Sequence, residues 1–286
     1  MKKRMTVLLV ACMLMLAACA GFAASEPLPQ SEAPEISEEA VETYEAPEYE
    51  TVPFTFGNQV RSEDDETVLA ICSYQTLQLA VHNPDAISPA DAEMAERAVE
   101  TFNNKMDAVN TDLGEQEAAI AADAAEIYAE YGSLSAEYED SAEMNAAFCG
   151  DVISTCLYRW SYTGGAHPNR YAVSYMFDLE AGQFIDPIQL ADDPEAFRTG
   201  AAALLVEKAD AWGQDAGGFW EDYAEVIAQW NTGTVQFTEE GMRIIYSPYE
   251  LGPYSMGEVE LLLDWEELEP LLGPGGMERL GRGNET

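Results

Sequence analysis

The sequence predicts an α+β fold, in which helices cover an antiparallel sheet. Two kinds of periodicity indicate this class: apolar residues recur at spacings of three and four after Ser88, and they alternate in strand-like runs after Asp151. The apolar content of 47% is typical of a folded globular chain. At 286 residues, the chain is long enough for one large domain or two small ones.

The first residues have the features of an export signal. A basic start at residues 2–4 precedes an apolar run over residues 5–18, which at about 14 residues is too short to span a membrane. The stretch Leu16-Ala17-Ala18-Cys19 resembles the bacterial lipobox, in which the cysteine is acylated and becomes the mature N-terminus. We therefore expect a lipoprotein signal peptide over residues 1–18 and lipidation of Cys19, on the outer face of the cytoplasmic membrane.

Ordinary secretion is the alternative fate. Cleavage near Ala23 or Ala24 would release the protein from the membrane. Since no later segment is apolar enough to span a bilayer, we expect the rest of the chain outside the cytoplasm in either case.

Residues 19–65 are predicted to form an acidic, disordered tether. Thirteen acidic residues and five prolines lie between positions 26 and 66. Because proline resists helix and sheet and like charges repel, this composition favours an extended chain. Such a tether would hold the folded part away from a lipid surface.

The charge balance restricts the possible partners. The chain has 53 acidic residues against 13 lysines and arginines, a net charge of −40. Removal of residues 1–18 takes away three positive charges and no negative one, which leaves −43. We expect no nucleic-acid ligand, because polyanions repel each other and phosphate contacts need Lys or Arg. The acidity indicates either solubility alone or attraction to a cationic partner.

The first folded segment is predicted to be a strand over residues 67–83, followed by a long helix. Ser88-Pro89 can cap and start this helix, with Asp91 in a capping-box-like position. Gly114 is expected to weaken the helix and Gly132 to end it. The apolar face contains Ala95, Ala98, Phe102, Met106, Val109 and Leu113.

Alternating runs then predict two strands. Cys149-Gly150-Asp151 is expected to be the turn into the first, which has Ser154 as a polar exception on its apolar side. That side contains Val152, Cys156, Tyr158, Trp160 and Tyr162. The second strand contains Tyr171, Val173, Tyr175 and Phe177, and a turn at Gly182 follows it.

The C-terminal part is predicted to be helical over residues 194–230. Its apolar stripe of Phe219, Tyr223, Val226, Ile227 and Trp230 is interpreted as core. Three β segments follow, around Phe237, Ile244–Tyr246 and Val259–Leu263. A short helix over residues 265–272 comes next, and a disordered tail over residues 273–286 is expected to end the chain.

Three cysteines remain in the folded part, Cys72, Cys149 and Cys156. Their odd number allows at most one internal disulfide, and buried free thiols are the alternative. With only two histidines in the chain, they do not have a zinc-binding spacing. We expect no metal and no cofactor.

His167 is the first residue to consider as a reactive group, because it follows Gly164-Gly165 between the two strands. As a general base it would need an orienting partner, such as Asp178 or a tyrosine. The alternative is architectural: the glycines let the chain turn, and the imidazole bonds to nearby backbone groups. A second loop, Tyr249–Glu258, either packs its tyrosines inward or presents them to a ligand.

Motifs of common catalytic sites do not occur in the sequence. G-x-S-x-G, H-E-x-x-H, the P-loop and the EF-hand loop are all missing. Pairs of carboxylates cannot identify a catalytic site in this sequence, since 53 acidic residues provide many accidental pairs.

Three stretches resemble a known family when taken in order: "YTGGAHPN", "FDLEAGQFIDPIQL" and "FTEEGMRIIYSPYELGPYSMGEVELLLDWEEL". They are similar to a bacterial extracytoplasmic family of paired uncharacterised domains, numbered 4163 and 3298. The resemblance runs from Tyr158 to Leu272 and is weaker from Glu66 to Tyr158, where it depends on strand–helix–strand order. In that family the module forms ectodomains of lysozyme-sensing anti-sigma factors and the non-catalytic part of peptidoglycan deacetylases, and it also occurs alone in lipoproteins.

The resemblance implies the stand-alone lipoprotein form, with two segments, 66–165 and 166–272, packed as one unit. We expect a non-enzymatic binding module for a cell-wall component or for a cationic wall-active protein such as lysozyme. One alternative is a peptidoglycan-modifying hydrolase that uses His167 or a carboxylate pair, and another is a structural partner in a membrane complex. The expected ligand-binding residues are Tyr162, Gly164, Gly165, His167, Tyr249, Glu250, Pro253, Tyr254 and Glu258.

Overall fold

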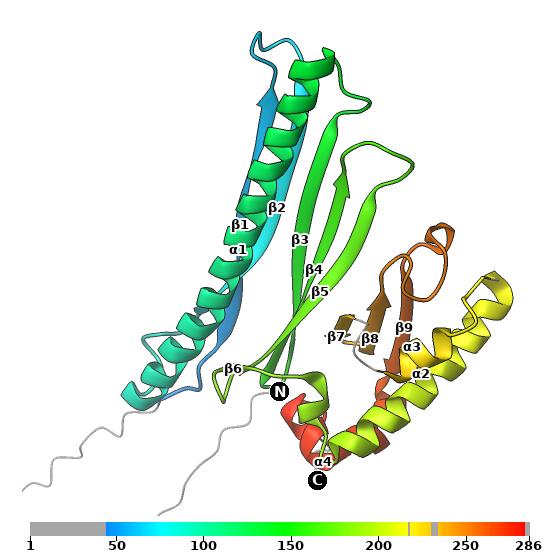
Figure 1. Cartoon of the computed structure of the whole chain (residues 1–286). Helices are drawn as coiled ribbons and strands as arrows, with labels where there is room; N and C mark the ends of the chain where they lie inside the picture. Colours follow the sequence, from blue (N-terminus) through cyan, green and yellow to red (C-terminus); the bar gives the residue numbers. More distant parts are fainter. Residues whose placement is uncertain (1–43, 217, 230–233, 284–286) are drawn as a thin grey trace, which may run out of the picture. The chain divides into compact units, whose positions relative to one another are not determined.

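The larger of two sheets has six strands in the computed structural model, which describes residues 44–216, 218–229 and 234–283 (Figure 1). Their spatial order follows the sequence: β1 Tyr49–Arg61, β2 Val68–Val81, β3 Tyr138–Cys149, β4 Val152–Tyr162, β5 Asn169–Asp178 and β6 Gln183–Phe184. Neighbouring strands are antiparallel except β2 and β3, which are parallel. A parallel pair needs a long crossover, and α1 (Pro89–Tyr131) provides it. The α+β class is confirmed.

Helix α1 begins and ends where the sequence predicts. The Ser88 hydroxyl accepts a hydrogen bond from the Asp91 N–H at 3.2 Å, and Gly132 ends the helix with φ 71°. The predicted apolar face is the buried one and packs on one face of the large sheet. The helix continues through Gly114, where weakening was expected, because Leu113 and Ile120 on either side are buried in the same core.

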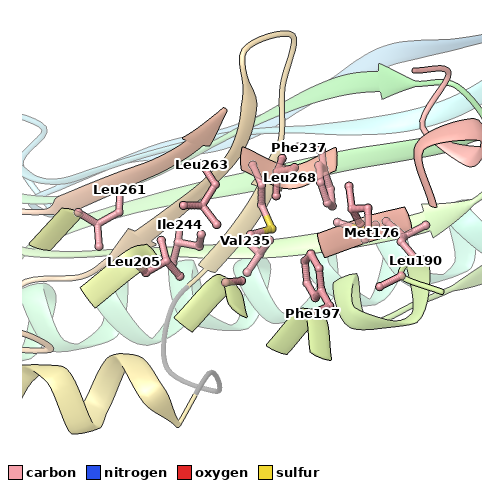
Figure 2. Packing of buried hydrophobic residues seen from close by; sticks show 14 of the residues in the cluster. Met176, Leu190, Phe197, Leu205, Val235, Phe237, Ile244, Leu261, Leu263 and Leu268 are labelled. Carbon is pink, nitrogen blue, oxygen red and sulfur yellow. The ribbon is translucent and has the colours of Figure 1, made fainter. Parts of the chain in front are cut away.

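The second sheet is a three-stranded antiparallel meander of β7 Thr234–Phe237, β8 Gly241–Tyr246 and β9 Val259–Asp264. Around it lie η1 Pro187–Leu190, α2 Pro194–Ala216, α3 Tyr223–Ala228, η2 Tyr254–Met256 and α4 Trp265–Arg279. Figure 2 shows their common core, in which Phe197 and Leu205 of α2 share one cluster with Leu268 of α4 and Met176 of β5.

The three predicted β segments are therefore confirmed as β7, β8 and β9. The single helix expected over residues 194–230 is wrong in one respect, because it is interrupted between α2 and α3. Phe219 lies in that interruption and stacks on Trp212 and Tyr223 with ring centroids 5.4 and 4.9 Å apart. Trp230 lies outside the described residues.

The small sheet contacts the large one through the outer edge of β7. The Phe237 N–H donates to the Ser154 hydroxyl at 2.9 Å, and the Val235 N–H donates to the Ser174 hydroxyl at 3.2 Å. An edge strand has unpaired backbone donors that are costly to bury. Ser154, the polar exception in the strand pattern, is therefore the acceptor that one of these donors needs.

The predicted disordered tether is wrong for its last part, because β1 occupies Tyr49–Arg61 and pairs with β2 along its length. The proline in this segment, Pro53, is compatible with an edge strand, where a missing N–H costs no ladder bond. Phe56 adds a packing contact, with its ring centroid 5.0 Å from that of Tyr74. Residues 1–43, including the signal peptide, Cys19 and the first part of the tether, lie outside the described residues.

The predicted disordered tail is also wrong, since α4 continues to Arg279 after a kink at Gly273. Its glycines permit close packing: the Gly275 N–H donates to the Asp192 carboxylate at 3.3 Å, and a Cβ on Gly276 would lie 2.6 Å from the Leu190 carbonyl oxygen. The glycine-rich composition of this segment predicts disorder, but these glycines instead allow the chain to pack closely against Leu190 and Asp192.

The expected boundary between residues 165 and 166 falls in the loop of the β4–β5 hairpin. These two strands pair from Val152 with Asp178 to Ser161 with Asn169, so the boundary divides one sheet. The change of sheet comes later, between β6 and β7.

The docked C-terminal end generates the first prediction. Leu280 is 1% exposed, so we expect Leu280→Ala to lower the free energy of unfolding by about 2–4 kcal/mol through lost burial and a cavity. The exposed neighbour Glu278, changed to alanine, is the matched control and should stay within about 0.5 kcal/mol of the wild type. Urea denaturation of both variants checks this, and equal stabilities would mean that this end of the chain does not pack.

Candidate binding site

The two loops expected to bind a ligand meet on the protein surface. One loop, residues 163–168, joins β4 to β5 and has His167 near its end. The other, residues 247–258, joins β8 to β9 and contains the short helix η2. Although 82 residues separate them in sequence, His167 and Tyr249 are hydrogen-bonded neighbours.

His167 lies between two tyrosines of the second loop. Its ring stacks on that of Tyr254, with centroids 3.7 Å apart and planes 16° from parallel. The Tyr249 ring centroid is 5.9 Å from that of His167 and 5.7 Å from that of Tyr254. Three of the expected binding residues therefore form one aromatic cluster, in which Tyr249 is half-exposed (51%).

Both imidazole nitrogens of His167 form hydrogen bonds. Nδ1 is 3.1 Å from the Pro168 carbonyl oxygen, which can only accept, so Nδ1 is the donor. In the tautomer that carries its proton on Nδ1, Nε2 accepts from the Tyr249 hydroxyl, whose oxygen is 2.9 Å away. The bond to the Pro168 carbonyl is of the backbone kind that the architectural interpretation of His167 predicts, whereas the Tyr249 hydroxyl is a partner of the kind that a general base would need.

Backbone geometry holds each loop in place. Gly164 and Gly165 have φ of 88° and 104°, a region that favours glycine, and the Tyr162 hydroxyl donates to the Gly165 carbonyl at 3.1 Å. These glycines shape the turn, as the sequence predicts. The second loop is under strain at Tyr249, where φ is 76° on a non-glycine residue.

Two further contacts fix the second loop. A Glu250 carboxylate oxygen accepts a hydrogen bond from the Ser247 N–H, which closes the turn around Tyr249. The backbone N–H of Trp220 donates to the Leu251 carbonyl at 3.0 Å and ties the loop to the connection between α2 and α3. Pro253 precedes η2, and its carbonyl accepts from the Met256 N–H at 2.9 Å. Glu250 and Pro253 thus shape the loop.

Glu258, at the end of the same loop, lines a groove of about 480 Å³. The groove crosses four strands, with Trp160 of β4 and Arg170 of β5 directly paired at one side and Glu143 of β3 at another. Leu157, at an odd position of β4, packs in the α1 core. Since strand side chains alternate, Trp160 lies on the sheet face opposite α1.

Glu258 and the β4 aromatics Tyr158 and Trp160 are named in the sequence analysis, but the other residues of the groove are not predicted from the sequence. Ser73, Gln75, Ser141, Glu143 and Arg170 come from three strands and are brought together only by strand register. No local pattern reveals such a register, so a single sequence holds no signal that could have found them.

An ion pair is buried beneath the strands that form the groove. One Asp140 oxygen accepts from the Tyr74 hydroxyl at 2.7 Å and from the Arg159 guanidinium at 3.2 Å. Burial raises the pKa of Asp140, and its bonds to Tyr74 and Arg159 oppose this shift. The pair joins β2, β3 and β4 on the α1 side.

The cysteine alternatives are resolved within the described residues, where Cys72, Cys149 and Cys156 are free and buried. Burial raises the pKa of each thiol, for Cys156 to about 11. In the same residues, no group of three or more His, Cys, Asp or Glu side chains is arranged to hold a metal ion. None of the described helices is both long and apolar enough to cross a bilayer.

These features define an α+β protein in which the loops of two sheets form one aromatic surface beside a polar groove. Residues 207–266 match the family described as "Protein of unknown function (DUF3298)". The match falls inside the region of the expected resemblance and confirms its 3298 part, whereas the 4163 part remains a prediction. No curated protein matches the chain.

Solved structures similar to this one include two from the DUF3298 family. A member of the DUF3298 family from Bacteroides fragilis NCTC 9343 has a TM-score of 0.53 at 15% identity, covering 83% of this chain and 98% of that one. A DUF3298 family protein from Pseudomonas aeruginosa PAO1 has a TM-score of 0.43 at 16% identity, covering 81% and 98%. The first likeness shows a shared fold.

The bond between His167 and Tyr249 predicts energetic coupling between the loops. We expect His167→Ala and Tyr249→Phe to be non-additive, with a coupling energy of about 0.5–1 kcal/mol in a double-mutant cycle measured by urea denaturation. The control cycle combines His82→Ala with Tyr249→Phe. Because His82 pairs with Glu50, these two changes should be additive. Additivity in the first cycle would show that the loops are not joined in solution.

Glu250 predicts a pH dependence. Burial raises its pKa above the usual value, and the bond from Ser247 opposes this shift. The stabilising contribution of the protonated carboxyl is therefore fully present below the unfolded pKa of about 4.3 and is lost as pH rises through the folded pKa.

Glu250→Gln keeps an acceptor for Ser247 but cannot ionise, so it should gain stability relative to the wild type between about pH 4 and about pH 7. Glu221→Gln, at an exposed position, controls for the change in net charge. Denaturation curves at several pH values check this, and parallel profiles for Glu250→Gln and the wild type would contradict it.

Proposed function

We propose that this protein is a non-enzymatic binding module of the bacterial cell envelope, whose ligand contacts the surface formed by residues 163–168 and 247–258. The observation that carries the proposal is the joining of two sheets at His167, Tyr249 and Tyr254. Loops on a rigid β scaffold are a common place for binding sites, and tyrosines contribute large contact areas at a low cost in side-chain entropy.

A cationic wall-active protein such as lysozyme is the proposed ligand, and a cell-wall component is the second candidate. The net charge of −40 supports the first, because an acidic surface accelerates encounter with a basic partner. Near the loops, Glu143 and Glu258 add carboxylates without a cationic partner among the described side chains. The tyrosines would anchor the complex that these charges help to form.

The proposed location is the outer face of the cytoplasmic membrane, through a lipid on Cys19, and secretion is the alternative. The lipobox-like stretch before Cys19 supports the anchored form. The described fold starts its first strand at Tyr49, which leaves about 30 residues after Cys19 to span the distance from a lipid surface.

Isothermal titration of the chain from Tyr44 to Thr286 with a basic lysozyme tests the proposal at two salt concentrations. We expect a micromolar or tighter Kd at about 0.05 M salt, and at least tenfold weaker binding at about 0.5 M, where screening is strong. Binding that ignores salt would assign the affinity to the tyrosines, and no binding at either concentration would remove lysozyme as the ligand.

Variants locate the binding surface in the same titration. Tyr249→Ala and Tyr254→Ala should each weaken binding by about fivefold or more, as expected of aromatic anchors. Phe148→Ala is the matched control, because Phe148 is 44% exposed and pairs with Ile153 at the opposite end of β4 from the loop. Equal losses in all three variants would place the contact elsewhere.

A further inference from the structure

Arg170 differs from the other cations of the described chain. Each of the other described lysines and arginines contacts a carboxylate or lies over an aromatic ring. The exposed side chain of Arg170 has no ion pair, hydrogen bond or ring contact with any described residue. In a chain with 53 acidic residues and 13 basic ones, an unpaired guanidinium at the side of a groove indicates an anion-binding group.

Trp160 lies beside Arg170, since the two residues are direct partners in the β4–β5 ladder and line the same groove. Directly opposed side chains of an antiparallel pair have Cβ atoms about 5 Å apart. A half-buried indole next to an unpaired guanidinium combines a flat apolar surface with a bidentate donor.

The other groove walls supply hydrogen-bonding groups. Ser73 and Gln75 of β2 pair in parallel register with Ser141 and Glu143 of β3. Glu258, at the end of the loop over residues 247–258, also lines the groove. Hydroxyl, amide and carboxylate groups of this kind bond well to the hydroxyl and amide groups of a sugar.

We propose that this groove binds a sugar ring that carries a carboxylate. The apolar face of the ring would stack on Trp160, the carboxylate would bond to Arg170, and ring hydroxyls would donate to Glu143 and Glu258. This deepens the proposed function, because it assigns a chemical class to the cell-wall ligand. The groove volume of about 480 Å³ lies in the usual range of small-ligand sites.

A single carboxylate can enter the groove despite the acidic surface. Charges elsewhere on the chain are screened beyond about 8 Å at physiological ionic strength, whereas the contact with Arg170 is direct. Glu143 and Glu258 would accept hydrogen bonds from hydroxyl groups, which are neutral, so they need not face the carboxylate.

N-acetylmuramic acid and N-acetylglucosamine form a matched pair of probes, because the first adds one carboxylate on a lactyl ether. We expect the acidic sugar to bind the chain from Tyr44 to Thr286 with a millimolar Kd, measured in a titration monitored by ligand-observed NMR. We expect about tenfold weaker binding of the neutral sugar. Arg170→Gln should abolish this preference, and Arg170→Lys should restore only part of it, because lysine lacks the planar fork.

Trp160→Ala should reduce binding of both sugars, and Trp160→Tyr should retain most of it, because a flat ring remains. Titration of each variant with lysozyme shows separately whether the protein-binding function is intact. Equal affinity for the two sugars with and without Arg170, or no sugar binding at up to about 20 mM, would overturn the groove assignment. Lysozyme binding would be unaffected by that failure.

Discussion

The docking of β7 against the face of the large sheet is the constraint on which the rest of the structure depends. The edge of a sheet is polar and its face is largely apolar, so burying one against the other leaves backbone donors without partners, at about 1–3 kcal/mol each. Ser154 and Ser174 remove this cost, since their hydroxyls accept from the β7 backbone. Side-chain bonds from Thr234 to the Ala172 carbonyl and from Gln236 to Asn145 also cross the contact. Because β8 and β9 follow β7, the loop between them is held where it reaches His167, and the candidate binding surface depends on this docking.

Local signals in the sequence predicted much of the fold, as the start of α1 at Ser88 and its end at Gly132 illustrate. β3 was missed for a tertiary reason. Its buried positions alternate, as a strand requires, but one of them is Asp140, which breaks the apolar pattern. That carboxylate is tolerated because Tyr74 and Arg159 bond to it, and both residues are distant in sequence. A polar residue at a core position can be recognised only when its partners are known.

The candidate site likewise has one part that the sequence predicts and another that depends on tertiary packing. Its loops could be predicted, because glycine, proline and tyrosine in Gly164-Gly165 and Tyr249–Glu258 are local evidence of shaped turns. The meeting of His167 with Tyr249 and Tyr254 could not, since it depends on how two sheets pack. The groove depends on register as well: a shift of one residue between β4 and β5 would place Arg170 opposite Ser161 or Arg159 and separate it from Trp160.

The distribution of charge links the fold to the ligands it can accept. Most of the few cations serve the interior or hold elements together, as in the pairs of Arg279 with Asp178 and Lys208 with Glu267. The remaining surface is acidic and repels polyanions at long range. Within a screening length the sign can reverse, because one unpaired guanidinium acts on a group in direct contact with it. The proposed ligands are consistent with this distribution, since a basic protein is attracted by the overall charge, whereas a mostly neutral ring with a single carboxylate depends on the local contact with Arg170.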